Sequence, residues 1–398
     1  VIVGTIVATR GEDSMVTRAQ RRRLTSRRVR LRRTIVAVVA VALIAGGVSL
    51  FAVLRGSAGL PVAETPPTPS PTSTPTPTPT PTPLTAARTL LSTTTDPKAC
   101  AVSFVGDGIS LAPQLQTQDL RFDKLPIPRA EGRVFAGWYA SPGDAAALSL
   151  PARVNGADLV SCTAREKTLY AAWTTPESNA AEDAGIPILM YHQFTRNPEG
   201  EDTWLRANYT YIGDFDAQMA YIQESGFYLP TWDELSAFID GAVFLPKRSV
   251  IITDDDADST WLEQAAPVVD GRNLLTTSFV ITSARTEGTP NRFVLQRSHT
   301  HDMHRAGANG KGRMVNEDAD TIAADLQQSA EILGAKEVVA YPFGHYDDTT
   351  KEGLRRAGFE LGRTVEHGYV RVGTDKLALP VIRMNYGMTV DDLKDAIG

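Results

Sequence analysis

The chain has 398 residues, enough for more than one hydrophobic core, and its formal net charge is −6. Residues 1–33 contain ten arginines and two acidic residues, so the 40 Lys+Arg and 46 Asp+Glu of the whole chain leave 30 against 44, about −14, for the remainder. An acidic body of this kind excludes nucleic acid as the expected partner, because binding to a phosphate backbone depends on clustered Lys and Arg.

The N-terminal region is predicted to anchor the chain in a membrane. Residues 1–33 are interpreted as a basic cytoplasmic segment and residues 34–55 as a transmembrane helix, because residues 35–54 carry no charge over a length that can cross about 30 Å of hydrocarbon. The arginines before this helix place the N-terminus in the cytoplasm and everything downstream outside it. The alternative is a cleaved signal peptide, which would also export the rest of the chain and leave it secreted.

Residues 56–98 are expected to form a linker, since residues 61–85 are dominated by alternating Thr and Pro. Such a segment favours extended polyproline II structure and acts as a semi-rigid spacer. The only two cysteines, Cys100 and Cys162, follow this linker. Outside the membrane a structural disulfide between them is expected, with two unpaired thiols as the alternative.

Residues 99–174 are predicted to form a small independent domain, with strands near residues 101–105, 133–139 and 168–173. Phe135-Ala-Gly-Trp-Tyr139 and Leu169-Tyr-Ala-Ala-Trp173 resemble the β-grasp B-repeat of internalin-type bacterial surface proteins. In so small a unit the tryptophans are expected in the core, because large aromatic side chains supply most of the buried area. Stacking of an exposed tryptophan on a sugar ring is the alternative.

A second linker is expected at residues 175–185, and beyond it apolar runs alternate with segments of helical spacing. The predicted strands cover residues 186–191, 250–253, 278–281, 293–295 and 338–341. The predicted helices cover residues 214–225, 232–239, 262–269, 318–333, 350–357 and 390–397. This alternation predicts an α/β layer or barrel over residues 186–398, with its chemistry at the carboxyl ends of the strands.

Two clusters of polar residues follow apolar runs in this region. Ser249-Val-Ile-Ile-Thr-Asp-Asp-Asp-Ala-Asp258 ends in three consecutive carboxylates, and Ser298-His-Thr-His-Asp-Met-His304 contains three of the six histidines. Closely spaced carboxylates at the edge of a core are costly unless a cation or a catalytic task requires them. Carboxylate and imidazole together are the ligands of a catalytic divalent metal.

From residue 186 onward the motifs resemble the polysaccharide deacetylase family, which is carbohydrate esterase family 4 with its NodB homology domain, and within it the poly-N-acetylglucosamine deacetylases of bacterial surfaces. The motifs are Ile188-Leu-Met-Tyr-His-Gln-Phe194, Thr253-Asp-Asp-Asp256, the histidine segment, Ala340-Tyr-Pro-Phe-Gly344 and Leu379-Pro-x-Ile-Arg383. Their order makes the combination specific, although each alone is weak. The resemblance implies a distorted (β/α)7-type barrel.

The resemblance also implies a metal site and a catalytic base. It makes Asp255 the base and Asp256 a metal ligand, with His299 and His304 as the other protein ligands. Most of the family spaces the two histidines by four residues, where this chain has Met303, a poor ligand for an oxygen-rich site. His301 is therefore either the rival to His304 or a group that supports the ligands. Zinc is the expected ion for this ligand set, with cobalt or nickel as alternatives.

Further roles follow from the other motifs. His192 is expected to act as general acid, with a satisfied histidine at a strand end as the alternative. Much of the family has an arginine where Ala340 stands, and Arg383 is our candidate to replace it in supporting the catalytic aspartate, with an ordinary surface arginine as the alternative. The expected substrate groove and its tight turn consist of Tyr341, Pro342, Phe343 and Gly344.

Two positions depart from the family pattern. Asp254 stands where relatives have an aromatic residue, and Ala257 stands where they have glycine. The charge of Asp254 would either raise the pKa of Asp255 or face solvent. These departures leave open a degenerate domain that retains only binding.

The expected function is that of a metal-dependent hydrolase that removes N-acetyl groups from N-acetylglucosamine-type residues of a cell-surface or cell-wall polysaccharide. Its expected partners are an extracellular N-acetylated polysaccharide and the membrane, through the N-terminal helix. One alternative is a non-catalytic glycan-binding or adhesion protein with a degenerate deacetylase domain. Another is a de-O-acetylase of acetylated glycans, which would use the same site.

Overall fold

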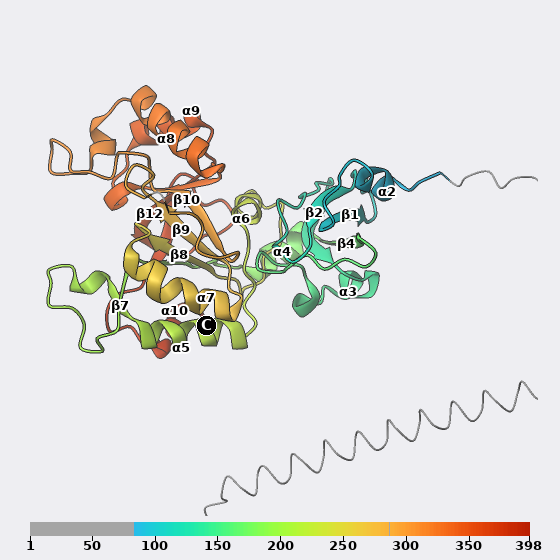
Figure 1. Cartoon of the computed structure of the whole chain (residues 1–398), viewed down its shortest axis with the longest axis horizontal. Coiled ribbons are helices and arrows are strands. Elements are labelled where there is room, and N and C mark those ends of the chain that lie inside the picture. The colour runs from blue at the N-terminus through green and yellow to red at the C-terminus, as the bar shows by residue number, and fades with distance from the viewer. Residues whose placement is uncertain (1–82, 286) are drawn as a thin grey trace, which may run out of the picture. The chain divides into compact units, whose positions relative to one another are not determined.

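The computed structural model describes residues 83–285 and 287–398. The predicted basic segment, the transmembrane helix and most of the Thr/Pro linker therefore lie outside the described residues. Within the described ranges, no helix is both long enough and apolar enough to span a bilayer. These residues form one compact unit, in which a small sheet precedes a barrel (Figure 1).

The small sheet has four strands in the order β2-β1-β4-β3. They are β1 (Ala99–Val105), β2 (Gln114–Thr117), β3 (Val134–Tyr139) and β4 (Glu166–Thr174), accompanied by helices α2 (Ala86–Leu91) and α3 (Pro142–Ala147). β1 and β4 are parallel, whereas the other two pairs are antiparallel. The sequence predicted three of these strands but neither β2 nor α2, which lies in the expected linker. The expected disulfide joins Cys100 to Cys162.

The small sheet packs against residues 242–244, which precede barrel strand β8, and the prediction that residues 99–174 form an independent domain stays a prediction. The Phe135 amide donates to the Ala242 carbonyl at 3.0 Å, and the Phe244 amide donates to the Phe135 carbonyl at 2.9 Å. The buried Arg153 guanidinium donates to the Phe244 carbonyl at 2.8 Å and to Glu234 at 3.2 Å. The expected second linker, residues 175–185, contains helix α4 (Pro176–Glu182).

Seven parallel strands close into a barrel in the order β10-β11-β12-β13-β5-β8-β9. They are β5 (Ile188–Tyr191), β8 (Ile251–Asp255), β9 (Thr276–Val280), β10 (Val294–Ser298), β11 (Val338–Ala340), β12 (Leu361–His367) and β13 (Leu379–Arg383). Five of them match predicted strands, whereas β12 and β13 were not predicted. The α/β class of this region is confirmed.

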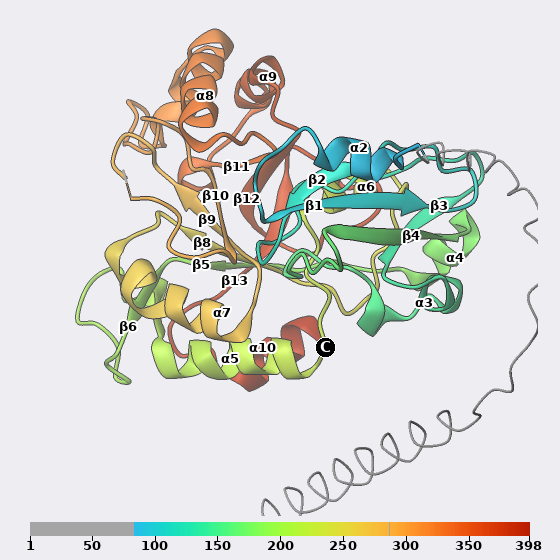
Figure 2. The same cartoon turned by 45° about the vertical axis from the view of Figure 1, so that its right-hand side comes forward.

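The helices lie on two sides of the barrel strands. Figures 1 and 2 show α8 and α9 on one side and α5, α7 and α10 on the other. The helices are α5 (Ile212–Glu224), α6 (Trp232–Ile239), α7 (Ala266–Arg272), α8 (Ala319–Leu333), α9 (Asp348–Ala357) and α10 (Val390–Ile397), with a π-helical turn at Trp261–Ala265. A two-stranded sheet, β6 (Gln193–Thr195) with β7 (Tyr209–Tyr211), follows β5.

Alternation along each strand divides the core into two layers. Inside the barrel, Ile251 packs in one cluster with residues such as Met190 and Phe279 from neighbouring strands. The next residue, Ile252, packs outside the barrel among side chains of α5 and α7, including Phe215 and Val269. Residues of odd number on β8 therefore face the barrel interior, and residues of even number face the surrounding helices.

Candidate metal centre

The three aspartates at the end of β8 have three different surroundings. Asp255 is the last residue of the strand and points into the barrel, whereas Asp254 points outward, as alternation requires. Asp256 and Ala257 then turn the chain in left-handed conformations, with φ of 73° and 48°. The Arg285 guanidinium holds this turn by donating from Nε to the Asp256 carbonyl at 3.3 Å. The turn directs the Asp256 carboxylate toward the end of β10.

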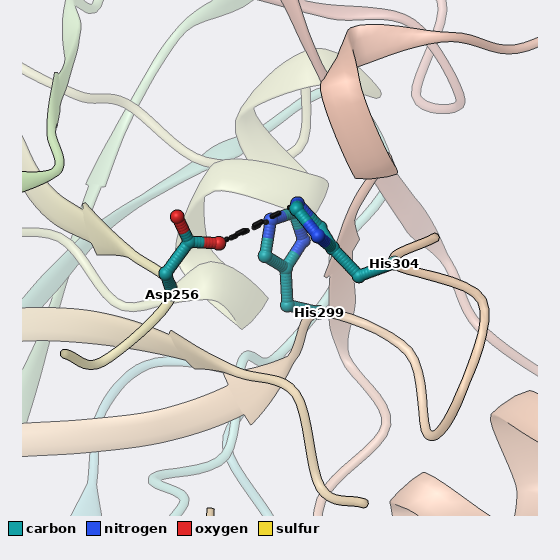
Figure 3. A group of neighbouring side chains, drawn as sticks. All are labelled: Asp256, His299 and His304. Carbon is teal, nitrogen blue, oxygen red and sulfur yellow. Dashed lines mark ion pairs between the residues drawn. The ribbon is translucent and has the colours of Figure 1, made fainter. Parts of the chain in front are cut away.

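Asp256, His299 and His304 point their side chains toward one another (Figure 3). Asp256 Oδ1 lies 3.5 Å from His299 Nε2 and 3.4 Å from His304 Nε2. His299 directly follows β10, and His304 lies on the loop beyond it. Three ligand atoms from two separate chain segments therefore converge at the carboxyl end of neighbouring strands β8, β9 and β10.

Hydrogen bonding and packing orient the two imidazoles. His299 Nδ1 lies 2.9 Å from the Ala340 carbonyl oxygen, which can only accept, so Nδ1 carries the proton and Nε2 presents a lone pair. The His304 ring packs between His299 and Phe343, with ring centroids 4.6 Å and 4.4 Å away. Burial, together with repulsion from His299, lowers the pKa of His304 to about 4. Its neutral form is the one that binds a metal.

The three side chains fit a divalent cation. Asp256 Oδ1 is buried and has no hydrogen-bond partner among the described residues. A bound cation would compensate this buried carboxylate oxygen. Ligand atoms about 2.1 Å from a tetrahedral ion stand about 3.4 Å apart. The two Asp–His separations match that spacing, and two nitrogens with one oxygen suit zinc, cobalt or nickel.

Asp255 is held by an arginine that the sequence analysis did not assign. Arg363 on β12 donates from Nη2 to Asp255 Oδ1, and both side chains are buried. Burial alone would raise the pKa of Asp255, but Arg363, with His192 and His299, outweighs it and lowers the pKa to about 2. Asp255 is therefore ionised at neutral pH.

The assignment of this role to Arg383 is wrong. Arg383 lies exposed at the end of β13, where it donates to the Asn208 side chain at 2.6 Å. Arg363 instead pairs in register with Ala340 across β11 and β12. The arginine thus stands one strand over from the position where relatives carry it. An arginine inside the otherwise strand-like run of residues 359–365 was the available signal.

His192 follows β5 and stands beside the base. Its Nε2 lies 3.7 Å from Asp255 Oδ2, and its Nδ1 is buried without a hydrogen-bond partner in the described part of the chain. Burial lowers the pKa of His192, although the Asp255 and Asp256 carboxylates act in the opposite direction. The ring is therefore neutral near pH 7.

Asp254 takes neither of the two roles expected for it. Its side chain is fully buried in the layer between the barrel and the helices, where it accepts a hydrogen bond from Ser278 Oγ at 3.3 Å. Burial, reinforced by the Asp255 and Asp258 charges, raises the pKa of Asp254 well above its usual value. The buried side chain does not face solvent, and the raised pKa favours its uncharged form, which places no charge next to Asp255.

The remaining predicted residues are divided between the site and the core. His301 lies outside the group of three, with Nδ1 3.0 Å from Thr282 Oγ1. Phe343 is half exposed beside His304 and can line a groove. Tyr341 cannot, because it is buried and its hydroxyl donates to the Leu377 carbonyl at 3.0 Å. Pro342 is buried, and Gly344 makes the tight turn with φ of 71°.

Residues 243–362 match the polysaccharide deacetylase family model. This segment contains Asp255, Asp256, His299 and His304, whereas His192 and residues 99–174 lie outside it. The match therefore supports a polysaccharide deacetylase domain around the metal centre. The resemblance of residues 99–174 to B-repeats stays a prediction.

Similar proteins include poly-beta-1,6-N-acetyl-D-glucosamine N-deacetylases. The one from Staphylococcus aureus strain MRSA252 is 26% identical over 189 residues, covering 42% of this chain and 65% of that protein. The one from Staphylococcus epidermidis is 24% identical over 190 residues with the same coverage. The chain thus matches slightly less than two thirds of the length of these relatives.

Solved structures that match this one include the Streptococcus pyogenes deacetylase PplD in complex with acetate. It has a TM-score of 0.46 at 22% identity and covers 54% of this chain and 99% of that one. The structure of IcaB from Ammonifex degensii also has a TM-score of 0.46 at 22% identity, covering 53% and 96%.

Proposed function

We propose that this protein is a metal-dependent hydrolase that removes N-acetyl groups from N-acetylglucosamine-type residues of an extracellular polysaccharide. The observation that carries the proposal is the convergence of Asp256, His299 and His304 beside the ionised Asp255. The similarity to N-deacetylases of poly-beta-1,6-N-acetyl-D-glucosamine supports the choice of substrate class.

Asp256 Oδ1 and the Nε2 atoms of His299 and His304 would hold the ion. A bound divalent cation supplies a Lewis acid that polarises the acetyl carbonyl and makes water more acidic. Three protein ligands leave positions open for substrate and water. The ligand set is complete, which favours an active enzyme over a degenerate binding domain.

Asp255 has the position of the general base. Its carboxylate accepts a proton from the attacking water, whose oxygen forms a bond to the acetyl carbon. A carboxylate with a pKa of about 2 does not keep a proton at neutral pH, so the proton moves on. Arg363 fixes the orientation of the carboxylate and keeps it ionised before each turnover.

His192 completes the proton path. Its Nε2 is the nearest imidazole nitrogen to Asp255 Oδ2, at 3.7 Å, and its neutral ring accepts the proton that Asp255 releases. The protonated ring then donates to the sugar nitrogen as the carbon–nitrogen bond breaks. Acetate and a free amine result, with one water consumed.

We also propose that the catalytic domain lies outside the cytoplasm. The Cys100–Cys162 disulfide supports an oxidising compartment outside the cytoplasm. A single N-terminal anchor over residues 34–55, with the catalytic domain extracellular, is consistent with this disulfide. Membrane attachment is tested by fractionation of cells that express the full chain.

The deciding experiment measures acetate release from N-acetylglucosamine oligomers by the full chain. We expect release that a chelator abolishes and zinc restores. Asp256→Asn should abolish it, whereas Asp270→Asn, which removes an exposed carboxylate on α7, should leave it unchanged. A folded, zinc-loaded protein that releases no acetate would overturn the proposal, and release only from O-acetylated glycans would point to the de-O-acetylase alternative.

A further inference from the structure

We infer that Asp325 on α8 is a positioning residue that holds His304 in place for metal binding. This inference rests on the metal centre of the proposed function. The Asp325 carboxylate accepts hydrogen bonds from two consecutive backbone amides, those of His301 and Asp302, each at 2.8 Å. These amides lie midway between the two histidine ligands.

The segment between the ligands is an irregular turn that needs outside support. His299 and His304 are five residues apart, and Thr300 between them is left-handed, with φ of 71°. A left-handed conformation costs a residue other than glycine about 1–2 kcal/mol, so the turn persists only where its surroundings hold it. Within the segment, the Met303 amide donates to Thr300 Oγ1 at 3.2 Å.

Helix α8 supplies much of this support from one face. Asp325 and Ser329 are four residues apart and therefore project from the same side of the helix. Ser329 Oγ lies 2.8 Å from Ser298 Oγ, which in turn accepts a hydrogen bond from the Thr300 amide at 3.0 Å. The helix thus holds the segment both at its start and at its middle.

The carboxylate acts through the backbone, not on the ion. Accepting two successive N–H groups fixes two adjacent peptide planes, and these planes set the direction in which the chain reaches His304. Met303, buried in the core beside α8, is a second anchor of the same segment. Loss of Asp325 should therefore weaken metal binding without abolishing it.

The test compares zinc affinity of the metal-free full chain and its variants by competition with a chromophoric chelator. Asp325→Ala should raise the Kd for zinc about 10- to 100-fold, the usual effect of removing a group that orients a ligand. Asp325→Asn should give a smaller rise, since its amide oxygen still accepts one N–H. Glu331→Ala removes an exposed carboxylate from the same helix and should leave the Kd within about twofold.

Circular dichroism and thermal unfolding of the metal-free proteins separate positioning from folding. A merely structural role would lower the melting temperature while leaving the zinc Kd of the folded protein unchanged, and that result would overturn the inference. If Asp325→Ala does not fold, Asp325→Asn decides the question by the same criterion. Failure of the parent to bind zinc would overturn the proposed function as well, whereas parent-like Kd values in both Asp325 variants would overturn this inference alone.

Discussion

Replacement of Arg363 by Met should strongly destabilise the protein at neutral pH, because it leaves the buried Asp255 carboxylate without its counter-charge. The pKa of Asp255 is lowered from 3.8 to about 2, which corresponds to about 2–3 kcal/mol of stability at pH 7. That figure is what remains after Arg363 and its neighbours have offset the burial cost. Removing one partner of a buried ion pair costs about 3–5 kcal/mol, and we expect a loss in that range.

The assay is urea denaturation of the metal-free protein, with Arg363→Met, Asp255→Asn and the double variant forming a cycle. Arg383→Met is the matched control and should change stability by no more than about 0.5 kcal/mol, because this arginine is exposed. The double variant should lose at least about 2 kcal/mol less than the sum of the single losses. A carboxyl group whose pKa is lowered by folding stabilises the protein only at pH values above its pKa in the unfolded chain. The stability lost in Arg363→Met should therefore shrink as the pH falls below about 4.

Two results would refute this reasoning. The first is an Arg363→Met loss below about 1 kcal/mol at pH 7, and the second is additivity of the single losses within about 0.5 kcal/mol. A transfer of the arginine adds a positive test. Because residues 340 and 363 are neighbours in register, Arg363→Ala combined with Ala340→Arg should recover part of the lost stability.

Three further predictions concern the surroundings of the site and the small sheet. Ala257→Gly should raise stability by up to about 1 kcal/mol in thermal unfolding, because Ala257 has φ of 48°, and a loss would contradict this. Asp254→Asn should stabilise the protein more at pH 8 than at pH 4. The pKa of Asp254 is raised in the folded protein, so the parent loses stability as the pH rises above the pKa that this residue has in the unfolded chain. Equal shifts of the urea midpoint at the two pH values would count against this prediction. Replacing Cys100 and Cys162 by serine should lower the free energy of unfolding by about 4 kcal/mol, because the unfolded chain regains the entropy that a cross-link over 62 positions removes. If reductant left the unfolding of the parent protein unchanged, that would argue against this prediction.

The sequence was sufficient for those parts of the site that lie close together along the chain. Asp255 and Asp256 end one apolar run, and His299 and His304 follow another, so parallel strands were enough to bring them to the same edge. The choice between His301 and His304 was left to the family spacing. The structure places His304 in the group and His301 outside it, and the segment that joins the two ligands contains a left-handed residue, Thr300.

Arg363 could not be assigned because its role depends on pairing between strands. It meets Asp255 across 108 positions, and only the register of β11 against β12 places it beside Ala340. The strand β12 was itself missed, since Gly362 and Arg363 interrupt its apolar run. Pairing between distant segments is the kind of information that local pattern does not contain.

The outward position of Asp254 is predictable from the sequence alone. Consecutive residues of a strand point to opposite faces, so Asp254 and Asp255 could not both enter the barrel. The packing of the small sheet on the barrel was a different matter. Its junction depends on Phe135 pairing with residues 242–244 and on the buried Arg153, and none of these has a local signature.

The most direct test of the central claim is a titration of the metal-free full chain with zinc while acetate release from N-acetylglucosamine oligomers is followed. The account predicts that activity rises in proportion to added zinc, reaches a plateau at one ion per chain, and is absent in Asp256→Asn at every zinc level. Acetate release by the metal-free chain at the plateau rate, or an Asp256→Asn protein that reaches the same plateau, would contradict it.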